Sequence, residues 1–251
     1  MEEKTNELKK GARFAGVLYL AIIMLTVYGH IYVPSQIFVK GDPIATSNNI
    51  LAHSFLFRSC IVAGLAESIL LLFLGLTLYR LFKQVNYKLA SAMVALSLVQ
   101  LPVAVVIAGF KFSALMILNG QPTGTVSFAS SSMQAMSILN MARYAMTMSG
   151  IVGAIWLFPF GMLVFRSRFM PRLFGVLLIS AGSVYVLEGL ISVLSSGYDG
   201  EAQILVFIFF LAEVLMMCWL LARGVKDHVS IEVISEKERT TRPEKIKEYF
   251  E

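Results

Sequence analysis

The sequence predicts an all-α polytopic membrane protein, a bundle of about six transmembrane helices with both termini on the cytoplasmic side. Of its 251 residues, 57% are hydrophobic and only 15% are charged, whereas an ordinary soluble domain has about 25% charged residues. A soluble chain of this length could not bury so much apolar surface in one core, but lipid can cover it. The net charge of +5 comes mostly from Lys and Arg beside apolar runs, which indicates lipid headgroups rather than nucleic acid.

Six segments are long enough to cross about 30 Å of hydrocarbon, and each is too long and too apolar to be a strand. In chain order the predicted spans are residues 14–33, 55–79, 89–118, 145–165, 173–194 and 204–222. The first apolar run exceeds the apolar core of a signal peptide, so we expect it to be retained as a helix that Pro34 ends. Residues 1–226 would form the transmembrane domain, and residues 227–251 a flexible charged cytoplasmic tail.

Basic residues occur at every second connection between these spans, as the positive-inside rule requires. The predicted cytoplasmic connections contain Lys9, Lys10, Arg13, Arg80, Lys83, Lys88, Arg166, Arg168, Arg172, Arg223 and Lys226. The opposite connections are poor in cations: Lys40 is accompanied by Asp42, residues 120–127 are uncharged, and Asp199 and Glu201 follow. We therefore predict a multi-pass protein of the cytoplasmic membrane with an N-in/C-in orientation.

Three local signals refine this outline. Asp42 followed by Pro43 is typical of a helix cap with proline at the first helical position, and predicts a helix that leads toward the second span. Residues 130–141 are polar and helix-permissive, so they would extend the fourth helix beyond the bilayer. Pro159, in the inner half of the same helix, predicts a kink.

Small residues inside the spans have structural interpretations. Gly64, Gly150 and Gly153 are expected at close contacts between helices. Cys60 and Cys218 are expected to be small buried side chains. Their positions along the helices differ in depth by roughly 20 Å, which excludes a disulfide bond between them.

Ionisable side chains at membrane depth are costly, and by default they indicate function. Counting residues along the helices places three acids near the middle of the bilayer and three bases near its outer surface. Polar residues also recur at helical spacing, as Tyr19, Thr26 and His30 do on the first helix. Such stripes should face the bundle rather than lipid, and together they predict a polar outer half with a cavity that opens outward. The predicted ligand-binding residues are Glu67, Glu188, Glu213, Arg58, Lys111, Arg143, His53, Gln100 and Tyr185.

A structural interpretation of the same residues stays open. The acids would then be protonated or paired with Arg143 or Lys111, and these bases could instead extend to the outer headgroups. His30, His53 and Glu67 are the one set from which an intramembrane metal site could be built. We predict no metal and no cofactor, because the sequence contains no catalytic, phosphate-binding or paired-cysteine motif.

Several stretches of the chain resemble a family of bacterial membrane proteins known as domain of unknown function 4386. They are Ala12-Arg13-Phe14-Ala15-Gly16-Val17-Leu18-Tyr19, Phe57-Arg58, Leu78-Tyr79-Arg80 before Val85-Asn86, and Phe165-Arg166-Ser167-Arg168-Phe169-Met170-Pro171-Arg172-Leu173-Phe174-Gly175-Val176-Leu177-Leu178. The last stretch is the most specific, and it has Arg168 where the family often has glycine. The resemblance covers roughly residues 12–224 and implies a six-helix prokaryotic membrane protein with no assigned activity.

Three functions are compatible with these observations. The first is binding or transport of a small anionic or amphipathic ligand, which would enter from outside past Arg58, Lys111 and Arg143. The second is a sensor, immunity protein or accessory subunit that acts through helix contacts with a membrane partner or a second copy of the chain. The third is an intramembrane enzyme acting on a lipid or isoprenoid, with Glu67 or His53 as its acid or base. We favour the first, and a non-enzymatic role.

Overall fold

The chain, described by a computed structural model, is mostly helical in the residues whose placement is defined, which are 2–120, 127–167, 170–194 and 203–223. Its elements are α1 (Glu2–Thr26), η1 (Val27–Tyr32), α2 (Val33–Ile37), α3 (Pro43–Ala52), α4 (Ser54–Phe82), α5 (Tyr87–Asn119), α6 (Phe128–Ser167), α7 (Arg172–Leu194) and α8 (Gln203–Arg223). No strand occurs in these residues, which confirms the all-α prediction. The predicted tail, residues 227–251, lies outside them, as do Asp199 and Glu201.

The first span differs from the prediction at its outer end. Pro34 does not end the helix but lies within the first positions of α2. Between α1 and α2 the backbone forms six residues of π-helix, and Val33 N donates to Tyr28 O across that segment. The flanking residues Thr26 and Val33 keep helical dihedral angles, so one helical rod continues to Ile37.

The predicted cap and the predicted extension are both confirmed. Asp42 accepts a hydrogen bond from Ala45 N at 2.9 Å and so begins α3. That helix ends at Ala52, and the non-helical dihedral angles of His53 separate it from α4. Residues 130–141 belong to the 40-residue helix α6, which stays continuous across the buried Pro159.

Five helical segments in the described residues are long and apolar enough to cross a membrane, so the chain is a multi-pass membrane protein. They are Lys9–Ile37, Ser54–Phe82, Tyr87–Asn119, Phe128–Ser167 and Arg172–Leu194. The sixth predicted span corresponds to α8, whose apolar part Phe207–Ala222 is shorter. The count of six and the N-in/C-in orientation therefore stay predictions.

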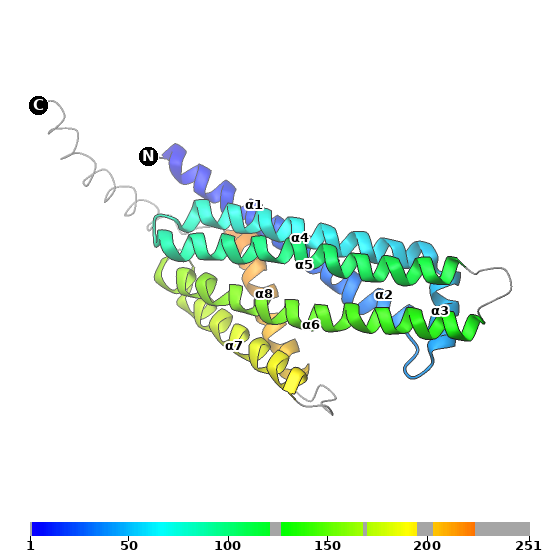
Figure 1. Ribbon diagram of the computed structural model, residues 1–251. Coiled ribbons are helices and arrows are strands. Elements are labelled where there is room, and N and C mark those ends of the chain that lie inside the picture. The colour runs from blue at the N-terminus through cyan, green and yellow to red at the C-terminus, as the bar shows by residue number, and fades with distance from the viewer. Residues whose placement is uncertain (1, 121–126, 168–169, 195–202, 224–251) are drawn as a thin grey trace, which may run out of the picture.

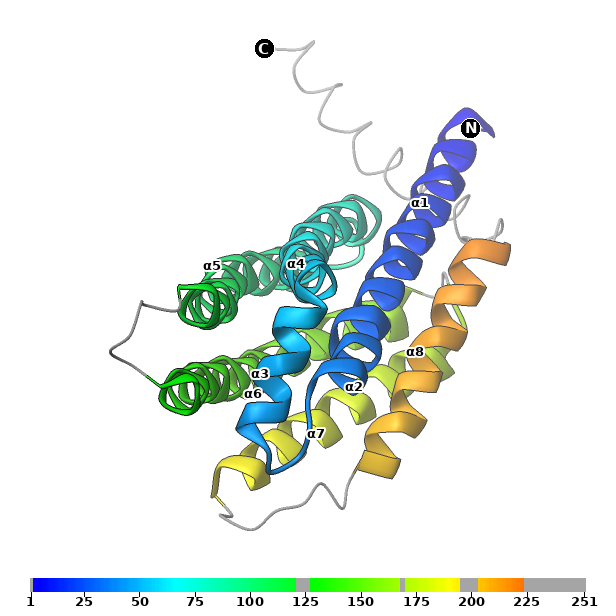
Figure 2. The ribbon, with the colours of Figure 1, turned by 90° about the vertical axis from the view of Figure 1, so that its right-hand side faces the viewer.

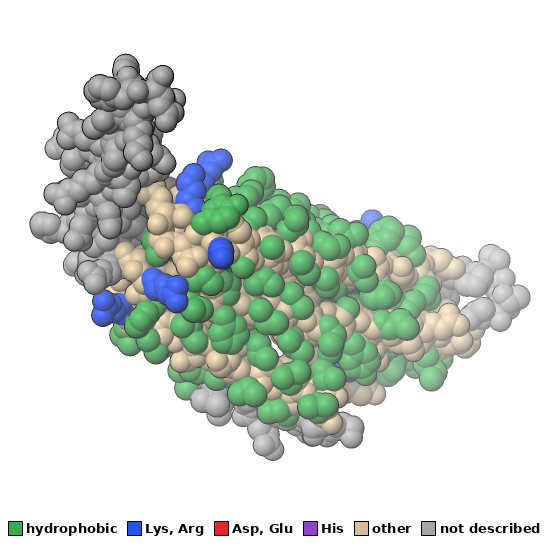
Figure 3. All heavy atoms as spheres, turned by 60° about the vertical axis from the view of Figure 1, so that its left-hand side comes forward, with side chains coloured by type: hydrophobic (Ala, Val, Ile, Leu, Met, Phe, Trp, Pro, Cys, Tyr) green, Lys and Arg blue, Asp and Glu red, His purple; other side chains and the backbone are tan. Residues whose placement is uncertain are grey.

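The six long helices form a closed ring. Each contacts two neighbours, in the order α1, α4, α5, α6, α7, α8 and back to α1. Figures 1 and 2 show that the start of α1 and the end of α8 lie at the same end of this ring, which we call the inner end. Lys and Arg gather mainly toward that end, while hydrophobic side chains cover the long sides (Figure 3). At the opposite, outer end, α3 packs against α5 and α6.

Two apolar cores fill the ring at different depths. The inner core joins all six long helices and includes the fully buried Phe160, Leu163 and Met216. The outer core joins α2 and α3 to α4, α5 and α6, and includes Ile50 and Phe57. The prediction of a polar outer half is therefore wrong in part, because apolar side chains of the short helices pack over the outer end.

Candidate functional site

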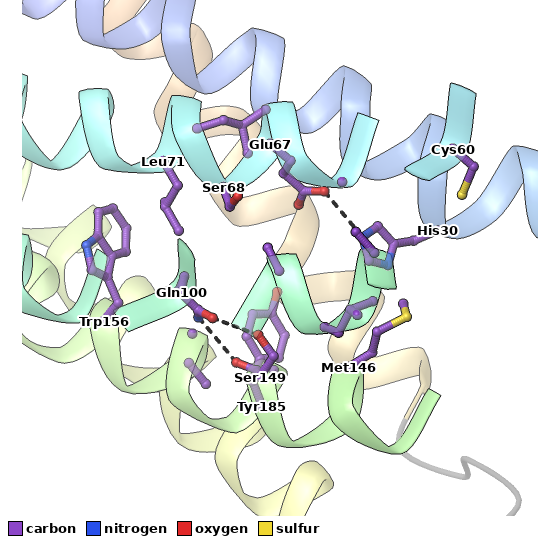
Figure 4. A pocket seen from close by; sticks show the side chains of 18 of the residues that line it. His30, Cys60, Glu67, Ser68, Leu71, Gln100, Met146, Ser149, Trp156 and Tyr185 are labelled. Atoms are coloured by element: carbon purple, nitrogen blue, oxygen red, sulfur yellow. Dashed lines mark hydrogen bonds and ion pairs between the residues drawn. The ribbon is translucent and has the colours of Figure 1, made fainter. Parts of the chain in front are cut away.

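A cavity of about 360 Å³ lies inside the ring, and all six long helices contribute to its wall. Its lining includes Tyr19, Trp156 and Leu157 of the inner core and Cys60 of the outer core, so the cavity lies between the two. Most lining residues are apolar, and the polar ones converge from different helices, as Figure 4 shows.

Five of the nine predicted ligand-binding residues line this cavity. They are Glu67 on α4, Gln100 and Lys111 on α5, Tyr185 on α7 and Glu213 on α8. The prediction that polar stripes on separate helices face a common space thus agrees with the positions of these five side chains.

The other four predicted residues are not part of the lining: Arg58, Arg143, His53 and Glu188. Arg58, Arg143 and His53 have exposed positions. Arg143 donates to Asn140 Oδ1 at 3.3 Å on its own helix, and its guanidinium lies over the Tyr144 ring. The three predicted bases therefore do not surround the cavity together, since Lys111 alone among them lines it.

Glu67 is held by the first span. Thr26 Oγ1 donates to its Oε1 at 2.8 Å, and His30 Nε2 lies 3.3 Å from its Oε2. The His30 side chain is 41% exposed and that of Glu67 is 24% exposed, so this pair lies at an accessible part of the wall (Figure 4). His30 belongs to the π-helical segment, which no sequence signal predicted.

Glu213 is held by two tyrosines. Tyr19 on α1 donates to Glu213 Oε2 at 2.5 Å, and the Tyr185 hydroxyl on α7 also hydrogen-bonds to this carboxyl. In the ring, α1 lies between α4 and α8. One face of the first span therefore binds both cavity acids, Glu67 through Thr26 and His30 and Glu213 through Tyr19.

The opposite wall carries a reciprocal pair of hydrogen bonds between α5 and α6. Ser149 Oγ donates to Gln100 Oε1 at 2.7 Å, and Gln100 Nε2 donates to Ser149 O at 3.2 Å (Figure 4). A Cβ on Gly153 would lie 2.8 Å from Gln100 Nε2, so the predicted close helix contact at this glycine is confirmed. The pair joins two neighbouring helices without using a charge.

Lys111 contacts sulfur rather than a carboxylate. Its Nζ lies 3.6 Å from Cys60 Sγ, and that thiol in turn donates to Gly29 O at 3.4 Å. Cys60 is buried as expected, whereas Cys218 is exposed, which corrects the prediction for the second cysteine. Within the described part of the chain, neither Lys111 nor Arg143 forms an ion pair with Glu67, Glu188 or Glu213.

A comparison of the whole chain with known protein families identifies its relatives. Residues 14–224 match the family described as Domain of unknown function (DUF4386). The chain belongs to this family. The match extends over every residue that lines the cavity, from Tyr19 to Glu213. No curated protein and no solved structure matches the chain. Since DUF4386 is a family of unknown function, the function of this member has to be argued from its site.

Two cavity residues of this DUF4386 protein have the opposite role from the predicted one. Gly64 and Gly150 line the cavity, and a Cβ built on either would have no heavy atom within 4 Å. They therefore leave space instead of bringing helices together. Gly64 precedes Glu67 by three residues and so shares its helix face, which is the sequence signal that could have assigned it to the cavity.

Ser149, Met146 and Trp156 also line the cavity without having been predicted to do so. They belong to α6, a helix with polar and apolar residues on several faces, so its sequence alone does not indicate which face turns inward. No group of three His, Cys, Asp or Glu side chains in the described residues could hold a metal ion. His53 is near Asn49 O rather than near His30 and Glu67.

Proposed function

We propose that this protein binds a small amphipathic ligand in the cavity between its two apolar cores. The observation that carries the proposal is the cavity itself, about 360 Å³ in volume, with a mostly apolar wall on which a few polar groups converge. Ligand sites in proteins have volumes of about 300–1,000 Å³ and the same kind of lining. A hydrophobic body would contact the walls, and a polar end would reach Glu67, Gln100 or Glu213.

The charges favour an amphipathic ligand over a small inorganic anion. Anion binding would need several bases around one space. Arg58 and Arg143 are exposed and outside the lining, so Lys111 is the one Lys or Arg among the lining residues, and His30 is already paired with Glu67. The apolar walls also favour a ligand that partitions into lipid.

The lengths of the helices suggest a route from the side. A Cβ on Gly189 of α7 would touch Ile151 of α6, and α7 ends only five residues later at Leu194. The outer part of α6 therefore extends well beyond its contact with α7. Two lining residues with exposed positions, His30 and Gly150, lie on the first span and on α6. A membrane-dissolved ligand would first meet the cavity wall at these two exposed residues.

The proposal is tested by filling the cavity. Gly64→Leu places a side chain where even a Cβ has no neighbour within 4 Å, so it should fill the site without disturbing packing. Trp156 lines the cavity, and Trp219 is the second of the chain's two tryptophans. In a Trp219→Phe background the Trp156 emission then reports on a bound aromatic probe.

Neutral 1-aminoanthracene should quench Trp156 emission saturably in lipid nanodiscs, and Gly64→Leu should remove the saturable part. Gly109→Leu is the matched control, because Gly109 is exposed, has no neighbour within 4 Å of a built Cβ and lies outside the lining. Equal saturable quenching in the wild-type protein and Gly64→Leu would rule out the cavity as the binding site.

A further inference from the structure

We infer that the ligand carries a positively charged, amine-type head group that binds to the carboxyl groups of Glu67 and Glu213. This inference rests on the proposed function and names the class of ligand for the same cavity. It differs from the sequence-based expectation of an anionic or amphipathic ligand, which relied on three bases, Arg58, Lys111 and Arg143, along the entrance. The argument depends on which charges line the cavity and on what already neutralises them.

Neutral groups supply most of the partners of the two acids. Thr26 donates to Glu67, and Tyr19 and Tyr185 hydrogen-bond to Glu213. Such hydrogen bonds orient a carboxylate and satisfy its oxygens, but they add no opposite charge. In the described residues the one ion-pair partner at this cavity is His30, beside Glu67. A carboxylate inside a membrane without a counter-charge is unfavourable, so a bound cation would stabilise this arrangement.

Lys111 lies at a different depth from these acids. Its Nζ contacts the sulfur of Cys60, and Cys60 is two helical turns before Glu67 on α4. At a rise of 1.5 Å per residue, the contact is roughly 10 Å closer to the outer end than Glu67. At that depth a lysine is near the outer headgroups and water, which can balance its charge. Among the described residues, the middle of the cavity therefore contains two acids and neither Lys nor Arg.

The rest of the wall suits the apolar part of such a ligand. Ile22, Leu71, Ile107 and Leu157 provide aliphatic contacts around the acids. Trp156 also lines the cavity, and an indole ring can bind an organic cation over its face as well as an apolar group. A hydrophobic amine or quaternary cation thus matches both the walls and the acids, whereas an anion of the same size matches only the walls.

Two ions of the same shape and opposite charge test the inference directly. Tetraphenylphosphonium and tetraphenylborate each carry four phenyl groups, so their apolar contacts are closely matched. Equilibrium dialysis with the detergent-solubilised protein measures binding of both, and only the component lost in Gly64→Leu is counted, which removes partitioning into micelles. We expect the phosphonium to bind at least about tenfold more tightly than the borate.

Two variants that each remove one acidic charge, together with a matched control, test whether Glu67 and Glu213 cause the preference for the phosphonium. Glu67→Gln and Glu213→Gln keep an oxygen that accepts from Thr26 or Tyr19, and each should lower phosphonium affinity about tenfold while borate binding stays equal or rises. Glu188→Gln removes a partly buried acid at similar depth that is outside the lining, and should leave both affinities unchanged.

Equal affinities, a preference for the borate, or the same loss in Glu188→Gln would overturn the inference. The comparison of the two ions needs only the wild-type protein and Gly64→Leu, so it decides the question even where a glutamine variant fails to fold. Cavity binding of the borate alone would reject the cationic ligand and keep the proposed function. Loss of cavity binding for both ions would reject the inference, and the neutral 1-aminoanthracene titration would then decide the proposed function separately.

Discussion

Glycines bring helices together in the inner half of the bundle, whereas two glycines of the cavity wall, Gly64 and Gly150, leave space open. A Cβ on Gly175 of α7 would lie 2.7 Å from Gly161 O and from Phe165 N on α6, and a Cβ on Gly161 would lie 2.8 Å from Gly175 O. A Cβ on Gly64 or Gly150 would meet no heavy atom within 4 Å. The same residue type thus supports tight backbone packing at one depth and a binding volume at another.

This difference indicates how a membrane bundle can combine a rigid half with a binding site. In lipid the hydrophobic effect drives helix association only weakly, so close backbone approach and dispersion contacts hold the inner core together. Gly64 and Gly150 make no such contacts, and around the cavity hydrogen bonds such as that of Thr26 with Glu67 join neighbouring helices. The following variants should separate the two regions by their effects on stability.

The largest loss is expected for Gly175→Leu. Its Cβ would collide with backbone atoms of Gly161 and Phe165, which cannot move aside without separating α6 from α7. We expect a loss of about 3 kcal/mol or more, seen as a large drop in thermal stability and in the monodisperse fraction in detergent. Gly109→Leu controls for the larger side chain. Wild-type stability of Gly175→Leu would contradict the close approach of α6 and α7.

The same substitution at the cavity should leave stability nearly unchanged. Gly64→Leu meets open space, so its free energy of unfolding should stay within about 0.5 kcal/mol of the wild-type value or rise slightly. Thermal denaturation of Gly64→Leu beside Gly175→Leu measures the comparison directly. A loss at Gly64 as large as that at Gly175 would remove the distinction between the two kinds of glycine.

A loss smaller than that of Gly175→Leu is expected at the border between the two regions. Trp156 Nε1 donates to Ser97 Oγ at 2.9 Å, and the Ser97 hydroxyl donates to Met93 O at 2.9 Å within α5. Trp156→Phe keeps an aromatic ring but removes the indole N–H donor. This change should lower the free energy of unfolding by about 1 kcal/mol. A double-mutant cycle with Ser97→Ala isolates the contribution of this bond. Strictly additive losses would indicate that the two side chains do not interact.

A loss confined to one short helix is expected outside the ring, at the start of α3. Asp42→Ala removes the oxygen that accepts from Ala45 N, with an expected loss of about 0.5–1 kcal/mol confined to this helix. Hydrogen exchange should accelerate in α3 and stay unchanged in the inner core. Asp42→Asn, which can still cap the helix, should restore protection. Faster exchange throughout the inner core would indicate that the two regions are coupled more tightly than their separate packing implies.

The structural features that the sequence predicted correctly are those with a local physical cause. The apolar runs, the Asp42 cap and the helical residues 130–141 depend on nearby residues, and each agrees with the structure. The residues that line the cavity were predicted only in part. Tyr185 and Glu188 are three residues apart on α7 and lie on one stripe, yet only Tyr185 lines the cavity. Helical periodicity gives a face of a helix to within about 40°, and the packing of neighbouring helices decides which side chain on that face reaches the cavity.

The sequence by itself determined that the chain forms apolar helices, that acids occur within them and that basic residues flank them. These properties follow from the composition, from the length of each apolar run and from the order of charged residues along the chain. Their physical causes are the transfer of side chains into lipid and interactions within one or two helical turns. The tertiary structure alone decided that six helices close into a ring, that Glu67 and Glu213 meet the same face of the first span, and that Lys111 meets Cys60 instead of an acid. Those contacts join residues distant in sequence, so they depend on packing across the whole bundle.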